Sequence, residues 1–95
     1  QSTDIFIVTI GEEANTRSFK LLKDLRQNHI SADKDHIERS VKAQFKYSDK
    51  INSKFTIVIG DDELKNDTAT LKNMKTSEQT TVKLSTLVEE LKQKL

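Results

Sequence analysis

The sequence predicts an α/β domain: a five-stranded mixed sheet flanked by three helices, in the order β-α-β-α-β-β-β-α. Two β-branched apolar runs, residues 5–10 and 55–59, are each followed by one of the two glycines in the chain. Runs that are apolar on both faces are typical of buried parallel strands, which need a crossover between them. Two helical patterns lie between the runs, and a hairpin pattern and a last helix follow them.

The first helix is predicted over residues 13–28, where apolar residues recur at helical spacing. Phe19 is expected on its buried stripe with Leu22 and Leu25. The helix should end near His29, and residues 30–32 predict the start of a short edge strand with a polar far end.

The second helix is predicted over residues 41–51. Ser40 suits the N-cap, because its hydroxyl can accept a hydrogen bond from a free backbone N–H of the first turn. Gln44 is expected at the margin of the buried side. The residues expected to face the sheet are Val41, Phe45 and Ser48.

The second half of the chain predicts the antiparallel part of the sheet. Residues 61–66 indicate a turn or one short helical turn. Residues 68–72 alternate as a strand does, and residues 79–82 are predicted to pair back with them. The last helix is predicted over residues 85–95, with Ser85 as a possible cap. Its apolar stripe is Leu84, Leu87, Val88, Leu91 and Leu95.

Length and composition limit the classes of protein. The 95 residues form a single domain, 1–95, and the first residue, Gln1, indicates a fragment of a longer protein. With no cysteine, disulfides, thiolate metal sites and a cysteine nucleophile are excluded. No apolar stretch reaches the roughly 18–20 residues that a membrane span needs. The net charge of +1 means that a nucleic-acid site must be a local patch.

The residues that catalysis or metal binding would need are not assembled in the sequence. His29 lies where a helix must end, and His36 lies in a polar turn without a helical histidine pair. The acidic pairs and triplets suit helix starts and solvated loops better than acid–base chemistry. The segments after the two glycines carry carboxylates, which would repel a phosphate. We therefore expect no metal, no cofactor and no catalytic residue in this domain.

Basic charge is concentrated on the second predicted helix. Residues 39–54 contain five basic residues against one acidic residue, Asp49. Such a face is either simply solvated or tracks phosphates. Gln44 and Tyr47 could add an amide that reads a base edge and a ring that stacks on an unpaired base. The basic residues are Arg39, Lys42, Lys46, Lys50 and Lys54.

The same helix carries a resemblance to a known family. RSVKAQFKYSDK at 39–50 and FTIVIGDDELKNDTATLK at 55–72 resemble the C-terminal anticodon-binding domain of histidyl-tRNA synthetases, class II aminoacyl-tRNA synthetases. GEEA at 11–14 and the pair Glu78-Gln79 add to it. The resemblance extends from residue 5 to about residue 91 and implies a five-stranded mixed sheet with three main helices.

The resemblance also implies a function. A domain of this family grips the anticodon stem-loop of histidine tRNA and has no activity of its own. Its parent enzyme, a cytoplasmic homodimer, joins histidine to the tRNA with ATP and Mg in a separate catalytic domain. A regulatory or accessory synthetase-like domain used for protein–protein contacts is the alternative.

Site residues are carried over from the matching positions. Phosphate neutralisation is assigned to Arg39, Lys42 and Lys46, and base-edge contacts to Glu12 and Gln44. Tyr47 is a stacking candidate or partly buried. The full set of expected RNA-binding residues is Glu12, Glu38, Arg39, Ser40, Lys42, Gln44, Lys46, Tyr47 and Lys50.

Four departures from the family pattern stand where it often has glycine: His29, Glu38, Asp67 and Ser77. His29 and Asp67 are expected to adopt positive φ, which these residue types tolerate better than most. Glu38 places a carboxylate at the expected RNA surface, where it either weakens phosphate binding or accepts a hydrogen bond from a base.

Overall fold

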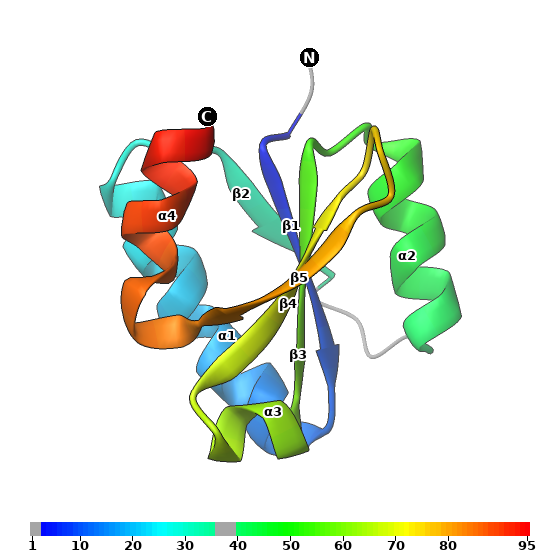
Figure 1. The fold of residues 1–95 in the computed structure, drawn as a ribbon. Coiled ribbons are helices and arrows are strands. Elements are labelled where there is room, and N and C mark those ends of the chain that lie inside the picture. Colours follow the sequence, from blue (N-terminus) through cyan, green and yellow to red (C-terminus); the bar gives the residue numbers. More distant parts are fainter. Residues whose placement is uncertain (1–2, 36–39) are drawn as a thin grey trace.

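The computed structural model describes residues 3–35 and 40–95. Its elements follow the predicted order, with one short additional helix and a 3₁₀ turn (Figure 1). They are β1 (Ile5–Ile10), α1 (Glu12–Gln27), β2 (Ala32–Lys34), α2 (Val41–Lys50), β3 (Phe55–Gly60), α3 (Asp61–Lys65), β4 (Thr68–Asn73), β5 (Gln79–Lys83), the 3₁₀ turn Leu84–Thr86 and α4 (Leu87–Lys94).

The five strands form one mixed sheet in the order β2-β1-β3-β4-β5, which confirms the predicted fold class. β2, β1 and β3 are parallel, whereas β4 and β5 run antiparallel as a hairpin. Ile7 of β1 stands beside Ile57 of β3, and Ile57 stands beside Leu71 of β4. The two glycine-ended runs are therefore adjacent central strands.

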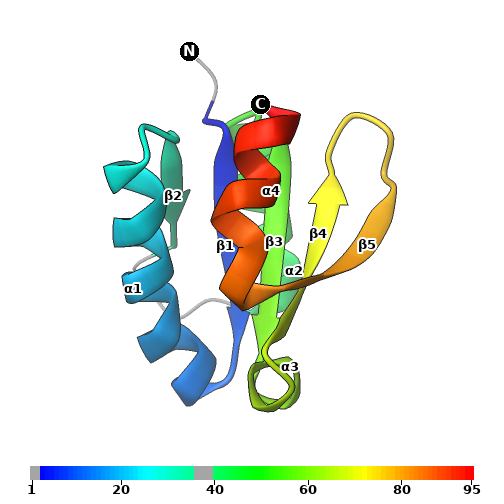
Figure 2. The same cartoon turned by 60° about the vertical axis from the view of Figure 1, so that its left-hand side comes forward.

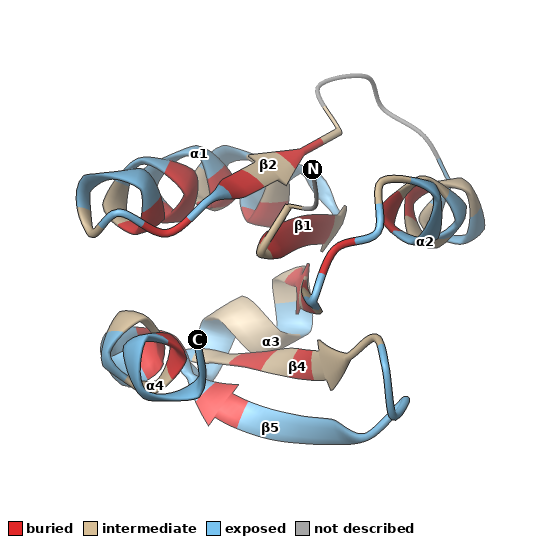
Figure 3. Cartoon of the chain, turned by 90° about the horizontal axis from the view of Figure 1, so that it is seen from above, coloured by how far each residue is buried: buried red, intermediate tan, exposed pale blue. Residues whose placement is uncertain are grey.

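The helices lie on both faces of the sheet. Seen from above, α1 and α4 cover one face and α2 covers the other (Figure 3). The turned view shows α4 in front of β1 and β3, α1 at the left beside β2, and α3 beyond the end of β3 (Figure 2). Because strand side chains alternate between faces, the core under α1 and α4 receives alternate residues of β1 and β3. Those residues are Ile5, Ile7, Ile57 and Ile59.

Several helix ends and turns agree with the sequence, and others are shifted. His29 (φ 63°) and Asp67 (φ 55°) adopt positive φ as expected, as does Ser77 (φ 65°). Asn52 (φ 59°), which follows α2, was not foreseen. Of the turn or short helical turn predicted over residues 61–66, the structure has the helical form, helix α3. Helix α4 begins two residues later than predicted, after the 3₁₀ turn.

The prediction that Phe19 is buried was wrong. The buried stripe of α1 runs through Ala14, Ser18 and Leu25, and this phase leaves Phe19 48% exposed at its margin. The edge strand is also later than predicted, so that Lys34 is buried and its Nζ lies 4.0 Å from the centroid of the Phe19 ring. Desolvation lowers the pKa of Lys34, and the nearby Asp35 carboxylate opposes that shift.

No helix within residues 3–35 and 40–95 is long and apolar enough to cross a membrane.

Candidate nucleic-acid interface

Helix α2 begins as the sequence predicts. The Ser40 hydroxyl accepts a hydrogen bond from the Ala43 backbone N–H at 3.2 Å, which satisfies one free donor of the first turn. The face of α2 that meets the sheet is polar, since its buried residues are Gln44 and Ser48. Phe45, expected in the core, is only half-buried. The helix is thus turned from the predicted orientation, and its lysines face solvent.

Gln44 completes the edge of β1. Strand β2 pairs with β1 only as far as Ile7, so the backbone of Thr9 lacks a strand on that side. The Gln44 side chain occupies that place: its Nε2 donates to the Thr9 carbonyl, and its Oε1 accepts from the Thr9 N–H, each at 3.0 Å. Both polar ends of the amide are used inside the fold. The base contact assigned to Gln44 would require the amide to leave Thr9, so the structure does not support that role.

Gln44→Glu should lower the free energy of unfolding by about 2 kcal/mol at pH 7, because an ionised carboxylate cannot donate to the Thr9 carbonyl and is buried. Below the pKa of the introduced carboxyl, the protonated group can donate again. Because folding raises that pKa, the loss should shrink as the pH falls from 7 to 4. Urea unfolding of the wild type and of Gln44→Glu at pH 7 and at pH 4 measures this loss of unfolding free energy. An equal loss at both pH values would contradict the hydrogen bond from Gln44 to the Thr9 carbonyl.

Besides the contact between Gln44 and Thr9, a chain of buried hydroxyls holds α2 against the sheet. The Ser48 hydroxyl lies 2.7 Å from the Ser53 hydroxyl and 2.7 Å from that of Thr56. Thr56 Oγ1 donates in turn to the thioether of Met74 at 3.0 Å. The chain therefore links α2 to the β4–β5 turn, where Met74 lies.

The two aromatic residues of α2 are both half-buried. The Tyr47 ring is tilted against that of Phe6, with 5.5 Å between the ring centroids. The partial burial considered for Tyr47 is confirmed, and its ring already has an aromatic partner. The Nζ of Lys72 lies 5.3 Å from the centroid of the Phe45 ring. Phe45 therefore faces the hairpin.

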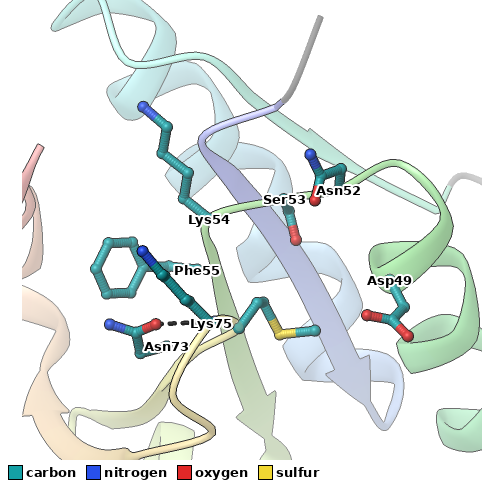
Figure 4. Close-up of a pocket in the computed structure, with 8 residues that line it drawn as sticks. Asp49, Asn52, Ser53, Lys54, Phe55, Asn73 and Lys75 are labelled. Atoms are coloured by element: carbon teal, nitrogen blue, oxygen red, sulfur yellow. Dashed lines mark hydrogen bonds between the residues drawn. The ribbon is translucent and has the colours of Figure 1, made fainter.

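Between α2 and the β4–β5 hairpin lies a hollow of about 400 Å³, which we call the basic groove. A second hollow of about 510 Å³ adjoins it at the end of α2 (Figure 4). Asp49 and Met74 line both hollows, so the two form a continuous surface. The residues lining the basic groove are Lys42, Phe45, Lys46, Asp49, Lys72, Met74 and Ser77.

None of the groove lysines forms an ion pair with a carboxylate of the described residues, although Asp49 lines the same groove. Ion pairs of the described residues join Arg26 to Asp33, Lys54 to Asp4 and Lys92 to Glu89. None of these includes a lysine of α2 or β4. Lys42, Lys46 and Lys50 are all exposed. Clustered, unpaired ammonium groups are what a polyanion with regularly spaced phosphates binds.

The other expected site residues lie apart or cannot be placed. Glu12 is the first residue of α1 and lines a different hollow with Arg17 and Asp61, so the structure does not bring it to the basic groove. Glu38 and Arg39, and His36 with them, lie outside the described residues. Ser40, the N-cap of α2, and Lys50, its last residue, are exposed but do not line the groove.

The sequence did not indicate the opposite wall of the groove. Lys72, Met74 and Ser77 come from β4 and the hairpin turn. The only signal was the positive charge at Lys72 within an alternating strand, which does not say which helix the strand faces.

A mixed sheet with a lysine-bearing helix across one face and a basic groove beside it is the arrangement expected of a small α/β domain that binds nucleic acid. The family model described as "Anticodon binding domain" matches residues 4–94. The chain belongs to this anticodon-binding domain family.

Relatives with similar sequences include histidine–tRNA ligases from several bacteria. The protein of that name from Alkaliphilus oremlandii is 52% identical over 84 residues, which are 88% of this chain and 20% of the relative. That from Staphylococcus aureus is 49% identical over 92 residues, 97% of this chain and 22% of the relative. The chain thus spans about a fifth of the length of the curated relatives that it matches.

Solved structures agree with the family. The crystal structure of apo S. aureus histidyl-tRNA synthetase matches with a TM-score of 0.92 and 49% identity, over 96% of this chain and 23% of that one. Histidyl-tRNA synthetase from Nostoc sp. PCC 7120 matches with a TM-score of 0.88 and 27% identity, over 100% of this chain and 22% of that one. The RNA binding domain of threonyl-tRNA synthetase from Cryptosporidium parvum, 16% identical with a TM-score of 0.85, has the same fold over 96% of this chain and 23% of that one.

Proposed function

We propose that this chain is the anticodon-recognition module of a histidine–tRNA ligase, and that the basic groove and the exposed face of α2 bind the anticodon stem-loop of histidine tRNA. The observation that carries the proposal is the set of exposed α2 lysines beside the groove, none of which forms an ion pair with a carboxylate of the described residues. The names of the relatives support the choice of amino acid.

The domain would act by binding alone. Joining histidine to the tRNA with ATP and Mg would fall to a catalytic domain in the rest of a cytoplasmic, homodimeric parent protein. Phosphates of the loop would contact Lys42 and Lys46 on α2 and Lys72 on β4. Unpaired bases would then lie in the groove, where a protein can reach their edges and faces.

Titrating the chain with the anticodon stem-loop at several salt concentrations tests the proposal. Affinity should fall steeply with salt, because phosphate contacts release condensed counterions. Lys42→Ala should reduce the slope of log K against log salt by about 1. Lys23→Ala, an exposed lysine on α1 across the sheet, should leave the slope unchanged.

Two results would count against the proposal. Absence of stem-loop binding at low salt would contradict RNA binding altogether, and would favour use of the domain for protein contacts. Equal affinity for a stem-loop with a scrambled anticodon would leave backbone binding standing, but would contradict the reading of bases.

A further inference from the structure

We infer that Asp49 accepts hydrogen bonds from the Watson–Crick edge of an unpaired guanine bound in the basic groove. The inference rests on the proposed function, since it names the base that the same RNA site would select. It gives Asp49, the one acidic residue among residues 39–54, a direct role in base recognition.

Asp49 has an unusual position for a carboxylate. It is the only acidic residue lining either the basic groove or the adjoining hollow among the described residues. It is exposed, and it makes no ion pair with a described lysine, although Lys42 and Lys46 line the same groove. Figure 4 shows it on the α2 side of the hollow, across from Asn73 and Lys75 on the hairpin side. Its oxygens are thus available to a ligand.

Met74 provides a surface on which a base can rest. Met74 lines both hollows with a flexible, polarisable side chain, and its sulfur accepts a hydrogen bond from Thr56 at 3.0 Å. Thr56 is fully buried and is held in turn by Ser48 on α2, one residue before Asp49. The hydroxyl chain therefore ties the Met74 side chain to the part of α2 that carries Asp49.

The chemistry of a carboxylate selects among the four bases. An ionised carboxylate only accepts hydrogen bonds. Guanine presents two adjacent donors, N1–H and the N2 amino group, which match the two oxygens of one carboxylate. Uracil places its single N3–H between two carbonyl oxygens that would face the carboxylate, and adenine and cytosine each offer only an amino group beside a ring acceptor. Phosphates flanking a bound guanine would meet the lysines of the groove.

The test compares three anticodon stem-loops that differ at one loop position, which carries guanosine, inosine or adenosine. Inosine keeps N1–H and lacks the N2 amino group. Every guanosine of the loop is replaced in turn, and binding to the chain is followed by fluorescence anisotropy. At one position, the wild-type chain should bind guanosine roughly 10- to 100-fold more tightly than adenosine, with inosine between them.

Asp49→Asn should abolish that preference while retaining RNA binding, because the amide presents one acceptor and one donor in place of two acceptors. Lys46→Ala is the matched control on the same helix: it should weaken binding to all three RNAs by a similar factor. Since Asp49 is exposed, the thermal unfolding midpoint of Asp49→Asn should match that of the wild type.

The outcomes separate the inference from the proposed function. RNA binding with equal affinity for the three bases at every position would overturn the role of Asp49 and leave the RNA site standing. A guanine preference that survives Asp49→Asn would also overturn it. If no RNA binds to the wild-type chain, both proposals fall.

Discussion

Replacing Gly11 with alanine should lower the free energy of unfolding by about 3 kcal/mol. Gly11 joins β1 to α1 with φ 108° and ψ 162°, a backbone conformation that L residues rarely adopt. An added Cβ would also lie 2.3 Å from the Asp61 carboxylate. That carboxylate accepts a hydrogen bond from the Ala14 N–H at 2.9 Å, and so caps α1 from a different part of the chain. The substitution therefore strains the backbone and displaces the cap.

Gly60→Ala is the matched control, because Gly60 also joins a strand to a helix. Its φ of −106° is accessible to alanine, and the nearest atom to an added Cβ is Glu63 Oε1 at 3.2 Å, at the end of a flexible side chain. We expect a loss below about 1 kcal/mol. Urea unfolding with a common m-value compares the two. Equal losses would show that neither the positive φ nor the Asp61 contact distinguishes Gly11.

The fold was largely predictable because its strongest signals are local. The runs at Ile5–Ile10 and Phe55–Gly60 are apolar on both faces, which only central strands require, and each is followed or closed by a glycine that begins a helix. His29 and Asp67 mark chain reversals by their residue types. These features depend on backbone sterics and on burial from both sides, which act on neighbours in sequence.

The buried side of α2 could not be read in the same way. A helix orientation is inferred from apolar residues, and this pattern favoured Phe45 over Gln44. In the structure, the requirement that decides the orientation is an unpaired stretch of backbone at Thr9, which only an amide side chain satisfies on both polar atoms. That requirement arises because β2 is short, and it becomes visible only when the strands are paired.

The candidate site was predictable for one wall alone. The lysines of α2 stand out as a charged stripe in the sequence. The facing residues, Lys72 and Met74, reach the groove because the hairpin lies opposite α2, which is a property of the assembled sheet. Asp49 gains its place between the two hollows from the same arrangement.

Reversing two charges on α2 should have the largest effect on function: Lys42→Glu combined with Lys46→Glu should weaken stem-loop binding about 100-fold or more. The two lysines lie one helical turn apart, so both can meet the same stretch of phosphates. Each ammonium–phosphate contact contributes on the order of 1 kcal/mol in water, and a carboxylate turns that attraction into a repulsion of similar size. Fluorescence anisotropy at low salt measures the loss.

Lys20→Glu combined with Lys23→Glu provides the matched control. Both lysines are exposed on α1, across the sheet from α2, and the two double variants carry the same net charge. A general attraction between the protein and RNA would be weakened equally by either pair. A local phosphate site predicts that the α2 pair has much the larger effect, and that the difference narrows as salt screens the contacts. Equal losses would therefore remove the basis for placing RNA at the basic groove, whereas a loss confined to the α2 pair would locate the phosphates beside Lys42 and Lys46.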